Sequence, residues 1–232
     1  MDATAIDDVL DTRPQRFRAT VGIVLIALAS ALGAWVYVRG PSPFTVDVWW
    51  NQLFAAAPSE PLYVFALAMD QVGGHLTAVL IVPLLGAAAI FATRRRWSAL
   101  YFLTASVGSA LLVQVLKHTF GRARPEDILI LSDYGSFPSG HTANAATIAV
   151  VAGVLFPRAW VRVVGAAWVI LMAFSRTYLH AHWLSDTVGG ALVGAGAALI
   201  LAAAFSRLRA RDEDRLTIRR ARKTDAVEAS SS

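Results

Sequence analysis

The sequence predicts an all-α, polytopic membrane protein: a bundle of six transmembrane helices with a short interfacial helix between the first two spans. Two observations lead to this fold class. Of the 232 residues, 56% are hydrophobic and only 16% are charged, whereas soluble domains carry about 25% charged residues. The hydrophobic residues also fall in long runs, each near the ~20 residues with which a helix crosses a bilayer. One domain of packed spans therefore accounts for nearly the whole chain.

Six apolar runs are the candidate spans. In order, they are Thr20–Val38, Gly74–Ala92, Trp97–Val115, Thr142–Phe156, Trp160–Phe174 and Asp186–Arg207. The fourth and fifth runs are short, so we expect flanking residues to lengthen those helices. The apolar stretch Leu62–Met69 is too short to cross. We expect it to lie at the interface or fold back, with Trp49 and Trp50 as interfacial anchors.

The runs divide the chain into a cytoplasmic N-terminal tail (1–19), a six-span domain (20–206) and a charged cytoplasmic C-terminal tail (207–232). The second tail is rich in charge and poor in apolar residues, so we expect it to be solvated and partly disordered. Arginines precede the first run, and a cleaved signal peptide is an alternative interpretation of it. That run is long enough to span, which favours a retained helix.

The charges predict the orientation. With six spans both termini lie on one side of the membrane, and 16 of the 21 Lys and Arg residues fall on that side. Positive charge marks the cytoplasmic side, so we expect a protein of the cell's inner (plasma) membrane with both termini in the cytoplasm. The remaining five cations lie outside: Arg39, Lys117, Arg122, Arg124 and Arg176. Because the cations cluster at span ends and in tails, the net charge of +5 does not indicate nucleic-acid binding.

Two of three short motifs lie around the third and fourth spans, on the outer side. Lys117 stands at the end of the third span, and Arg124-Pro125 follows after six residues, so that both cations can converge on one anion. Pro138-Ser139-Gly140-His141 immediately precedes the fourth span. The first N–H groups of a helix have no partner within the helix and bind anions, and the Ser139 hydroxyl adds a donor.

The third motif is Ser175-Arg176, followed by His182 and Asp186, which are four residues apart. A carboxylate beside a histidine fixes its tautomer, and arginine presents a fork suited to phosphate oxygens. The three motifs supply three cations, two histidines and a carboxylate for phosphoryl transfer without a metal. Each motif alone also fits a plain structural role, as a charged span end, a turn with a helix cap, or a helix pair. Their occurrence together on one side favours a site.

These motifs resemble those of the type 2 phosphatidic acid phosphatase superfamily: Lys-x6-Arg-Pro, Pro-Ser-Gly-His and Ser-Arg-x5-His-x3-Asp. Every defining position matches, and the resemblance covers roughly Leu62 to Arg207. It implies a six-helix membrane bundle, no metal or other cofactor, and a phosphohistidine intermediate. It also implies a role for each residue: Lys117, Arg124, Ser139, Gly140 and Arg176 bind phosphate, His182 attacks phosphorus with Asp186 orienting it, and His141 protonates the leaving oxygen and then activates water.

A site at the outer membrane surface favours a membrane lipid phosphate as substrate, with undecaprenyl diphosphate as first choice. Phosphatidylglycerol phosphate and phosphatidic acid are alternatives that no residue separates. Two other classes stay open. Vanadium-dependent haloperoxidases share the superfamily resemblance but are soluble proteins. A non-enzymatic lipid translocator or channel needs polar residues along a path through the bilayer, for which Gln114 and Asp70 are poor candidates. The oligomeric state is not readable.

Overall fold

The computed structural model describes residues 13–40, 42–74 and 80–231, with side chains described up to residue 218. This part of the chain forms nine α-helices and confirms the all-α prediction. They are α2 (Arg13–Arg39), α3 (Thr45–Ala55), α4 (Glu60–Gly73), α5 (Val82–Ala92), α6 (Arg96–Phe120), α7 (Gly140–Leu155), α8 (Ala159–Tyr178), α9 (Leu184–Ala204) and α10 (Ser206–Ser231). Most of the predicted N-terminal tail and residues 75–79 of the second predicted span lie outside the described residues.

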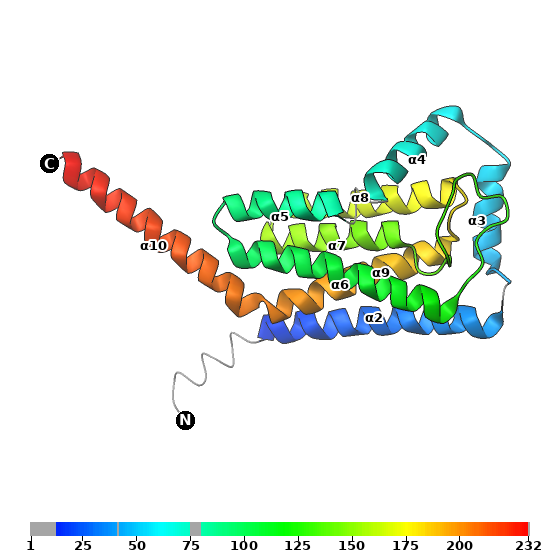
Figure 1. Cartoon of the computed structure of the whole chain (residues 1–232), viewed down its shortest axis with the longest axis horizontal. Helices are drawn as coiled ribbons and strands as arrows, with labels where there is room; N and C mark the ends of the chain where they lie inside the picture. Colours follow the sequence, from blue (N-terminus) through cyan, green and yellow to red (C-terminus); the bar gives the residue numbers. More distant parts are fainter. Residues whose placement is uncertain (1–12, 41, 75–79, 232) are drawn as a thin grey trace, which may run out of the picture.

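Six apolar helices run side by side and form the bundle: α2, α5, α6, α7, α8 and α9 (Figure 1). Four of them are long and apolar enough to cross a membrane, namely α2, α6, α8 and α9. The fifth predicted span is lengthened to 20 residues in α8, as expected. By contrast, α7 has 16 residues, about 24 Å of helix, and α5 has 11. The structure therefore shows a multi-pass membrane fold with four long spans and two shorter apolar helices.

Helix α9 packs against α2, α6, α7 and α8. Its glycines let the backbone of α7 approach closely. A Cβ on Gly190 would lie 2.3 Å from the carbonyl oxygen of Ser139, and one on Gly194 would lie 2.0 Å from that of Ala143. Small residues serve such close helix packing in membranes. The contact brings the start of α7, with the second motif, against the start of α9, with the third.

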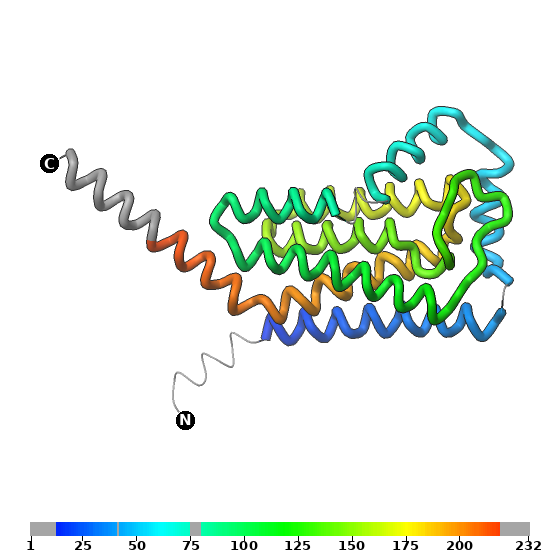
Figure 2. Tube along the Cα trace, viewed as in Figure 1, coloured from blue at the N-terminus to red at the C-terminus, as the bar shows by residue number. Residues whose placement is uncertain are grey.

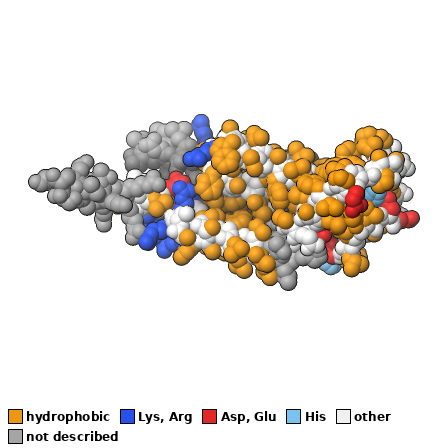
Figure 3. All heavy atoms as spheres, turned by 90° about the horizontal axis from the view of Figure 1, so that it is seen from above, with side chains coloured by type: hydrophobic (Ala, Val, Ile, Leu, Met, Phe, Trp, Pro, Cys, Tyr) orange, Lys and Arg blue, Asp and Glu red, His pale blue; other side chains and the backbone are white. Residues whose placement is uncertain are grey.

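The two ends of the bundle differ in what they carry. The start of α2, the end of α9 and the connections 93–95 and 156–158 lie at one end (Figure 1). The other end carries α3 and the loop 121–139 (Figure 2). In the view of Figure 3, Lys and Arg side chains gather at the first end, most Asp, Glu and His at the other, and hydrophobic side chains cover the body between them. This division agrees with the predicted pairing of span ends.

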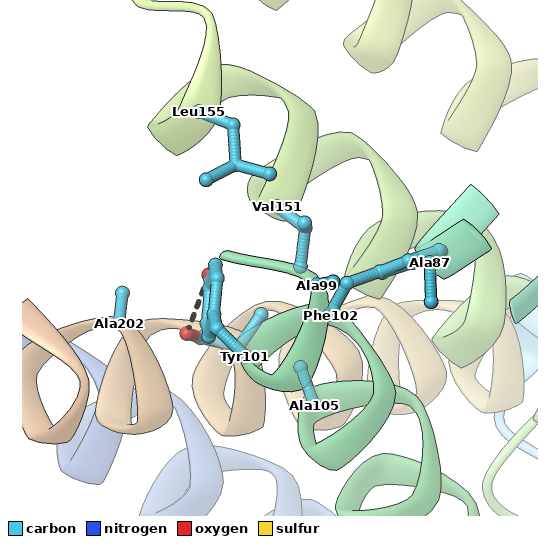
Figure 4. Packing of buried hydrophobic residues seen from close by; sticks show 9 residues of the cluster. Ala87, Ala99, Tyr101, Phe102, Ala105, Val151, Leu155 and Ala202 are labelled. Carbon is cyan, nitrogen blue, oxygen red and sulfur yellow. Dashed lines mark hydrogen bonds between the residues drawn. The ribbon is translucent and has the colours of Figure 1, made fainter. Parts of the chain in front are cut away.

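The core near the first end is formed by α5, α6, α7 and α9 (Figure 4). Tyr101 is fully buried there, and its hydroxyl donates a hydrogen bond of 3.0 Å to the carbonyl oxygen of Ala198. Alanines surround it, including Ala99, Ala105 and Ala202. This packing fixes α6 against α9 at the end opposite the three motifs.

Two expectations are wrong. The segment between the first two spans holds two helices, α3 and α4, and not one short helix; α3 lies across the end of the bundle (Figure 1), and α4 packs on α8 and α7. The C-terminal tail is helical rather than partly disordered, because residues 206–231 contain no Gly or Pro and many good helix formers. Within α10, buried Asp212 accepts hydrogen bonds from the backbone N–H groups of Trp97 and Ser98 at the start of α6.

Candidate active site

The three motifs meet at the end of the bundle that carries α3. A cavity of about 540 Å³ opens there. Five predicted site residues line it: Lys117, Gly140, His141, Arg176 and His182. Three others do not line it, although they lie in the same cluster of polar contacts: Arg124, Ser139 and Asp186. The structure thus brings the eight residues to one end of the bundle, five in the lining of the cavity and three outside it.

Lys117 and Arg124 converge on one anion, as expected, and that anion is the carboxylate of Asp133. Lys117 Nζ lies 3.0 and 2.9 Å from the two carboxylate oxygens, and Arg124 Nη2 lies 2.7 Å from Oδ1. Both cations also donate to the carbonyl oxygen of Gly135. Burial raises the pKa of Asp133, but the hydrogen bond and charge of Lys117 and the charge of Arg124 outweigh this and lower it. An ionised oxygen group thus occupies the point between the two cations.

The expected role of the Ser139 hydroxyl as a phosphate donor does not fit its position. Ser139 is the N-cap of α7, and its Oγ accepts hydrogen bonds from the backbone N–H and the hydroxyl of Thr142, at 3.4 and 3.1 Å. It is fully buried and does not line the cavity. Its backbone N–H donates to the carbonyl oxygen of Asp186 at 3.0 Å, which joins the second motif to the third. Gly140, the first residue of α7, does line the cavity.

Arg176 and His141 share a carboxylate on α4 that belongs to none of the motifs. Arg176 is almost fully buried, and its Nη1 donates to Oδ1 of Asp70. The same oxygen lies 3.1 Å from Nε2 of His141, within ion-pair distance but without hydrogen-bond geometry. Asp70 therefore bridges the second and third motifs from outside both.

His182 is held in one orientation by the backbone. Its Nδ1 lies 2.8 Å from the carbonyl oxygen of Ser136, which can only accept a hydrogen bond, so Nδ1 carries the proton. Nε2 is then the unprotonated nitrogen, and it lies 3.3 Å from Arg124 Nη1. Burial, followed by the positive charges of Arg124 and Arg176, lowers the pKa of His182 well below its ordinary value of 6.5. The ring is therefore neutral at pH 7, with a lone pair facing the cations.

Asp186 lies farther from the imidazole of His182 than the direct hydrogen bond that the spacing suggested. Its Oδ2 is 3.7 Å from Nδ1 of His182 and accepts instead from the Ser136 hydroxyl and the backbone N–H of Trp183. Helix α9 begins only at Leu184, after His182, so the two side chains do not share a helical face. Ser136 thus links the two residues: its hydroxyl contacts Asp186 and its carbonyl oxygen contacts His182.

Asp186 also belongs to a buried ionic network that the sequence did not reveal. Arg122 Nη1 lies 2.5 Å from Asp186 Oδ1, and Nη2 lies 2.7 Å from Asp47 Oδ2. Both carboxylates are fully buried. Asp47 further accepts from the backbone N–H and the hydroxyl of Ser185, at 2.8 and 2.7 Å. The network ties α3 to the start of α9 beside the third motif.

Sequence reasoning missed Asp70, Asp133 and Ser136, and treated Arg122 only as a topological charge. One signal was available for Asp70. It ends an apolar stretch of a membrane protein, where an ionisable residue is a functional candidate by default. Asp133 and Ser136 lie in the irregular loop 121–139, where no periodicity indicates which side chains turn inward. Within the described residues, no group of three or more His, Asp or Glu side chains is arranged to hold a metal ion; independence from metal stays a prediction.

The fold and this site define the class of protein: a multi-pass membrane protein with a cationic site at one end of its helical bundle. The PAP2 superfamily model matches residues 98–210. This part of the chain is a PAP2 superfamily domain, as the motifs indicated.

Relatives of known name support this membership. The lipid A 1-phosphatase of Rhizobium etli is 33% identical over 125 residues, which are 48% of this chain and 52% of the relative. Phosphatidylglycerophosphatase B of Bacillus subtilis is 31% identical over 124 residues, 49% of this chain and 61% of the relative. The chain thus spans about half the length of the curated relatives it matches.

A solved structure supports the fold. The crystal structure of a transmembrane PAP2-type phosphatidylglycerolphosphate phosphatase from Bacillus subtilis superposes with a TM-score of 0.64, covering 78% of this chain and 93% of that one. The two sequences are 23% identical. The similarity shows the PAP2 transmembrane fold.

Proposed function

We propose that this protein is a membrane lipid phosphatase that transfers the phosphoryl group of its substrate to His182 and then to water. The observation that carries the proposal is the orientation of His182. Its protonated nitrogen is fixed by Ser136, and its lone pair faces Arg124 beside the position where Lys117 and Arg124 hold an anionic carboxylate. A nucleophile next to a preorganised anion site is the arrangement that phosphoryl transfer requires.

In the proposed first step, the substrate phosphate takes the place of the Asp133 carboxylate between Lys117 and Arg124. Arg176 also lines the cavity, and its charge adds to the stabilisation of the phosphate oxygens. Nε2 of His182 attacks phosphorus, so an N–P bond forms as the bond to the leaving oxygen breaks. His141 gives its proton to that oxygen.

In the second step, water attacks the phosphohistidine. His141, now neutral, takes a proton from the water, the N–P bond breaks, and the electron pair returns to Nε2 of His182. Inorganic phosphate and the starting enzyme are the products. The same histidine serves as acid and then as base, as microscopic reversibility requires of a two-step transfer.

The walls of the cavity support a lipid substrate. Beyond the charged end, apolar side chains line it: Leu80, Pro83, Val107, Leu111 and Val113. Val107 and Leu111 are 56% and 63% exposed, so the same side chains contribute to the outer apolar surface of α6. A phosphate can therefore sit at the cationic end while its lipid tail lies against α5 and α6. We propose that this end faces the extracytoplasmic side, that the chain crosses the membrane six times, and that the termini are cytoplasmic.

The identity of the lipid is the finer proposal. The sequence favoured undecaprenyl diphosphate, with phosphatidylglycerol phosphate and phosphatidic acid as alternatives. Relatives named lipid A 1-phosphatase and phosphatidylglycerophosphatase B match over longer stretches than a relative named undecaprenyl-diphosphatase, which aligns over 63 residues. Lipid A 1-phosphate therefore joins the candidates.

The test is inorganic phosphate release by detergent-purified protein in the presence of EDTA, with the four lipids offered in parallel. We expect release from at least one lipid, unchanged by EDTA, because the cations of the site replace a metal ion. Release that EDTA abolishes would contradict the metal-free mechanism. If no lipid is hydrolysed by folded protein, the phosphatase proposal fails. Bromide oxidation by the vanadate-loaded protein would then support the haloperoxidase alternative.

A further inference from the structure

Asp70 is a buried carboxylate that no motif of the chain contains. It lies near the end of α4, is 5% exposed, and lines the cavity. It contacts both Arg176, through the hydrogen bond from Nη1 to its Oδ1, and His141, whose Nε2 is 3.1 Å from the same oxygen. Asp70 is thus the one described carboxylate in contact with the histidine to which the mechanism gives proton transfer.

The end of α4 is shaped to keep this contact. Gly73 and Gly74 follow Asp70 closely and lie against His141 and its neighbours. A Cβ on Gly74 would lie 2.2 Å from Nε2 of His141, and one on Gly73 would lie 2.3 Å from Cε of Met172 and 3.3 Å from Cδ2 of His141. Distances under 3.0 Å do not occur for real Cβ atoms. Any other residue at Gly74 would push the imidazole away from Asp70.

Asp70 is ionised in this environment. Burial raises the pKa of its carboxyl, but the adjacent imidazole of His141 and the charge of Arg176 outweigh this and bring it to about 2. A buried carboxylate is costly unless it is paired, and here both partners belong to the site. Two other groups of the site lie near His141: Arg176 on α8, which shares Asp70 with it, and His182, which lines the same cavity.

We propose that Asp70 is the positioning residue of His141: it holds Nε2 and stabilises the protonated ring, so that Nδ1 delivers the proton to the leaving oxygen. No hydrogen bond to Nδ1 occurs among the described residues, which leaves this nitrogen for the substrate. A carboxylate stabilises an imidazolium in this way when it contacts the nitrogen that does not react. Through Arg176, the same carboxylate also fixes one arm of the phosphate site. The inference rests on the proposed phosphatase function.

The test compares two substrates whose leaving groups differ in their need for a proton. Phosphoryl transfer from a lipid phosphomonoester such as phosphatidic acid expels a strongly basic alkoxide, whereas transfer from 4-nitrophenyl phosphate expels a weakly basic phenolate. We expect Asp70→Asn to lower the single-turnover rate of leaving-group release from the lipid phosphomonoester by about 10²-fold, the lower range for loss of general acid catalysis, and to lower that from 4-nitrophenyl phosphate far less. His141→Ala should show the same selectivity, and adding Asp70→Asn to it should cost little more, because residues acting as a unit are not additive.

Glu60→Gln is the matched control, an acid-to-amide change at an exposed position of the same helix; its kcat should equal that of wild type on both substrates. Equal losses on both substrates in Asp70→Asn, or a fully additive loss in the double variant, would overturn the proposal.

A second measurement does not depend on activity. Diethyl pyrocarbonate modifies neutral imidazole, so the pH midpoint of His141 modification should shift to lower pH in Asp70→Asn, while that of exposed His118 in the same protein should not change. An unchanged midpoint for His141 would also overturn the proposal. If wild type hydrolysed neither substrate, the phosphatase function would fail, and the labelling midpoint would still decide whether Asp70 favours the protonated ring of His141.

Discussion

His182→Ala is expected to lower kcat by on the order of 10⁵–10⁶-fold, the loss seen when a covalent nucleophile is removed. The neutral Nε2 of His182 faces Arg124, one of the two cations of the first motif. Without it, water would have to attack phosphorus directly in a site built around a fixed nucleophile. The remaining cations would still bind phosphate, so KM for the lipid should change much less than kcat.

Inorganic phosphate release from the preferred lipid measures this effect. His118→Ala is the control: His118 is exposed on α6 next to Lys117, and its Nδ1 contacts only the carbonyl oxygen of Gln114. Its activity should remain near that of wild type. A His182→Ala variant that is folded and keeps a tenth or more of wild-type kcat would refute the covalent mechanism.

Arg122→Met should destabilise the protein by about 3–5 kcal/mol, the cost of removing one partner from a buried ion pair. Asp47 and Asp186 are both fully buried, and Arg122 is the described cation that pairs with each of them. Its loss leaves both buried carboxylates without a cationic partner, although their hydrogen bonds remain. In a protein of this size the midpoint of thermal unfolding should fall by on the order of 10 °C.

Thermal unfolding in detergent measures the effect, with Arg39→Met as the control. Arg39 and Arg122 both lie over the ring of Phe44, but Arg39 is exposed. Asp47→Asn added to Arg122→Met should recover part of the loss, because it removes one of the two unpaired charges. If the control lowers the midpoint as much as Arg122→Met does, the network does not stabilise this end of the bundle.

The class of fold was predictable because membrane crossing constrains sequence strongly. A run of apolar residues has few other uses, and five of the six predicted spans correspond to helices that differ from them by a few residues or an extended end. The exception is the second predicted span, Gly74–Ala92, in which α5 begins only at Val82. The segment after α2 was harder to predict, because α3 and α4 mix polar and apolar residues over short lengths. The helix α10 was not predicted, because a segment rich in charge and poor in apolar residues also fits a disordered tail. Its residues nevertheless favour a helix strongly.

The site was predictable in its membership and not in its geometry. The four-residue spacing of His182 and Asp186 suggested a direct contact on one helix face. Helix α9 starts after His182, however, and the carbonyl oxygen of Ser136 contacts Nδ1 of His182 instead. Ser139 caps its own helix, a competing use for a hydroxyl at that position. Asp70 and Asp133 contact the motifs only through the tertiary fold, and no local pattern predicts such contacts.

Trapping the phosphoryl group on the protein tests the central claim most directly. His141→Ala, given 4-nitrophenyl phosphate, should form the phosphoenzyme readily but hydrolyse it slowly, since the base that activates water is missing. We would quench the reaction in base, which preserves phosphohistidine, and locate the phosphoryl group by peptide mass spectrometry. A phosphoryl group on His182, lost on treatment with acid, is the expected result. Turnover without an adduct, or an adduct on any other residue, would contradict it.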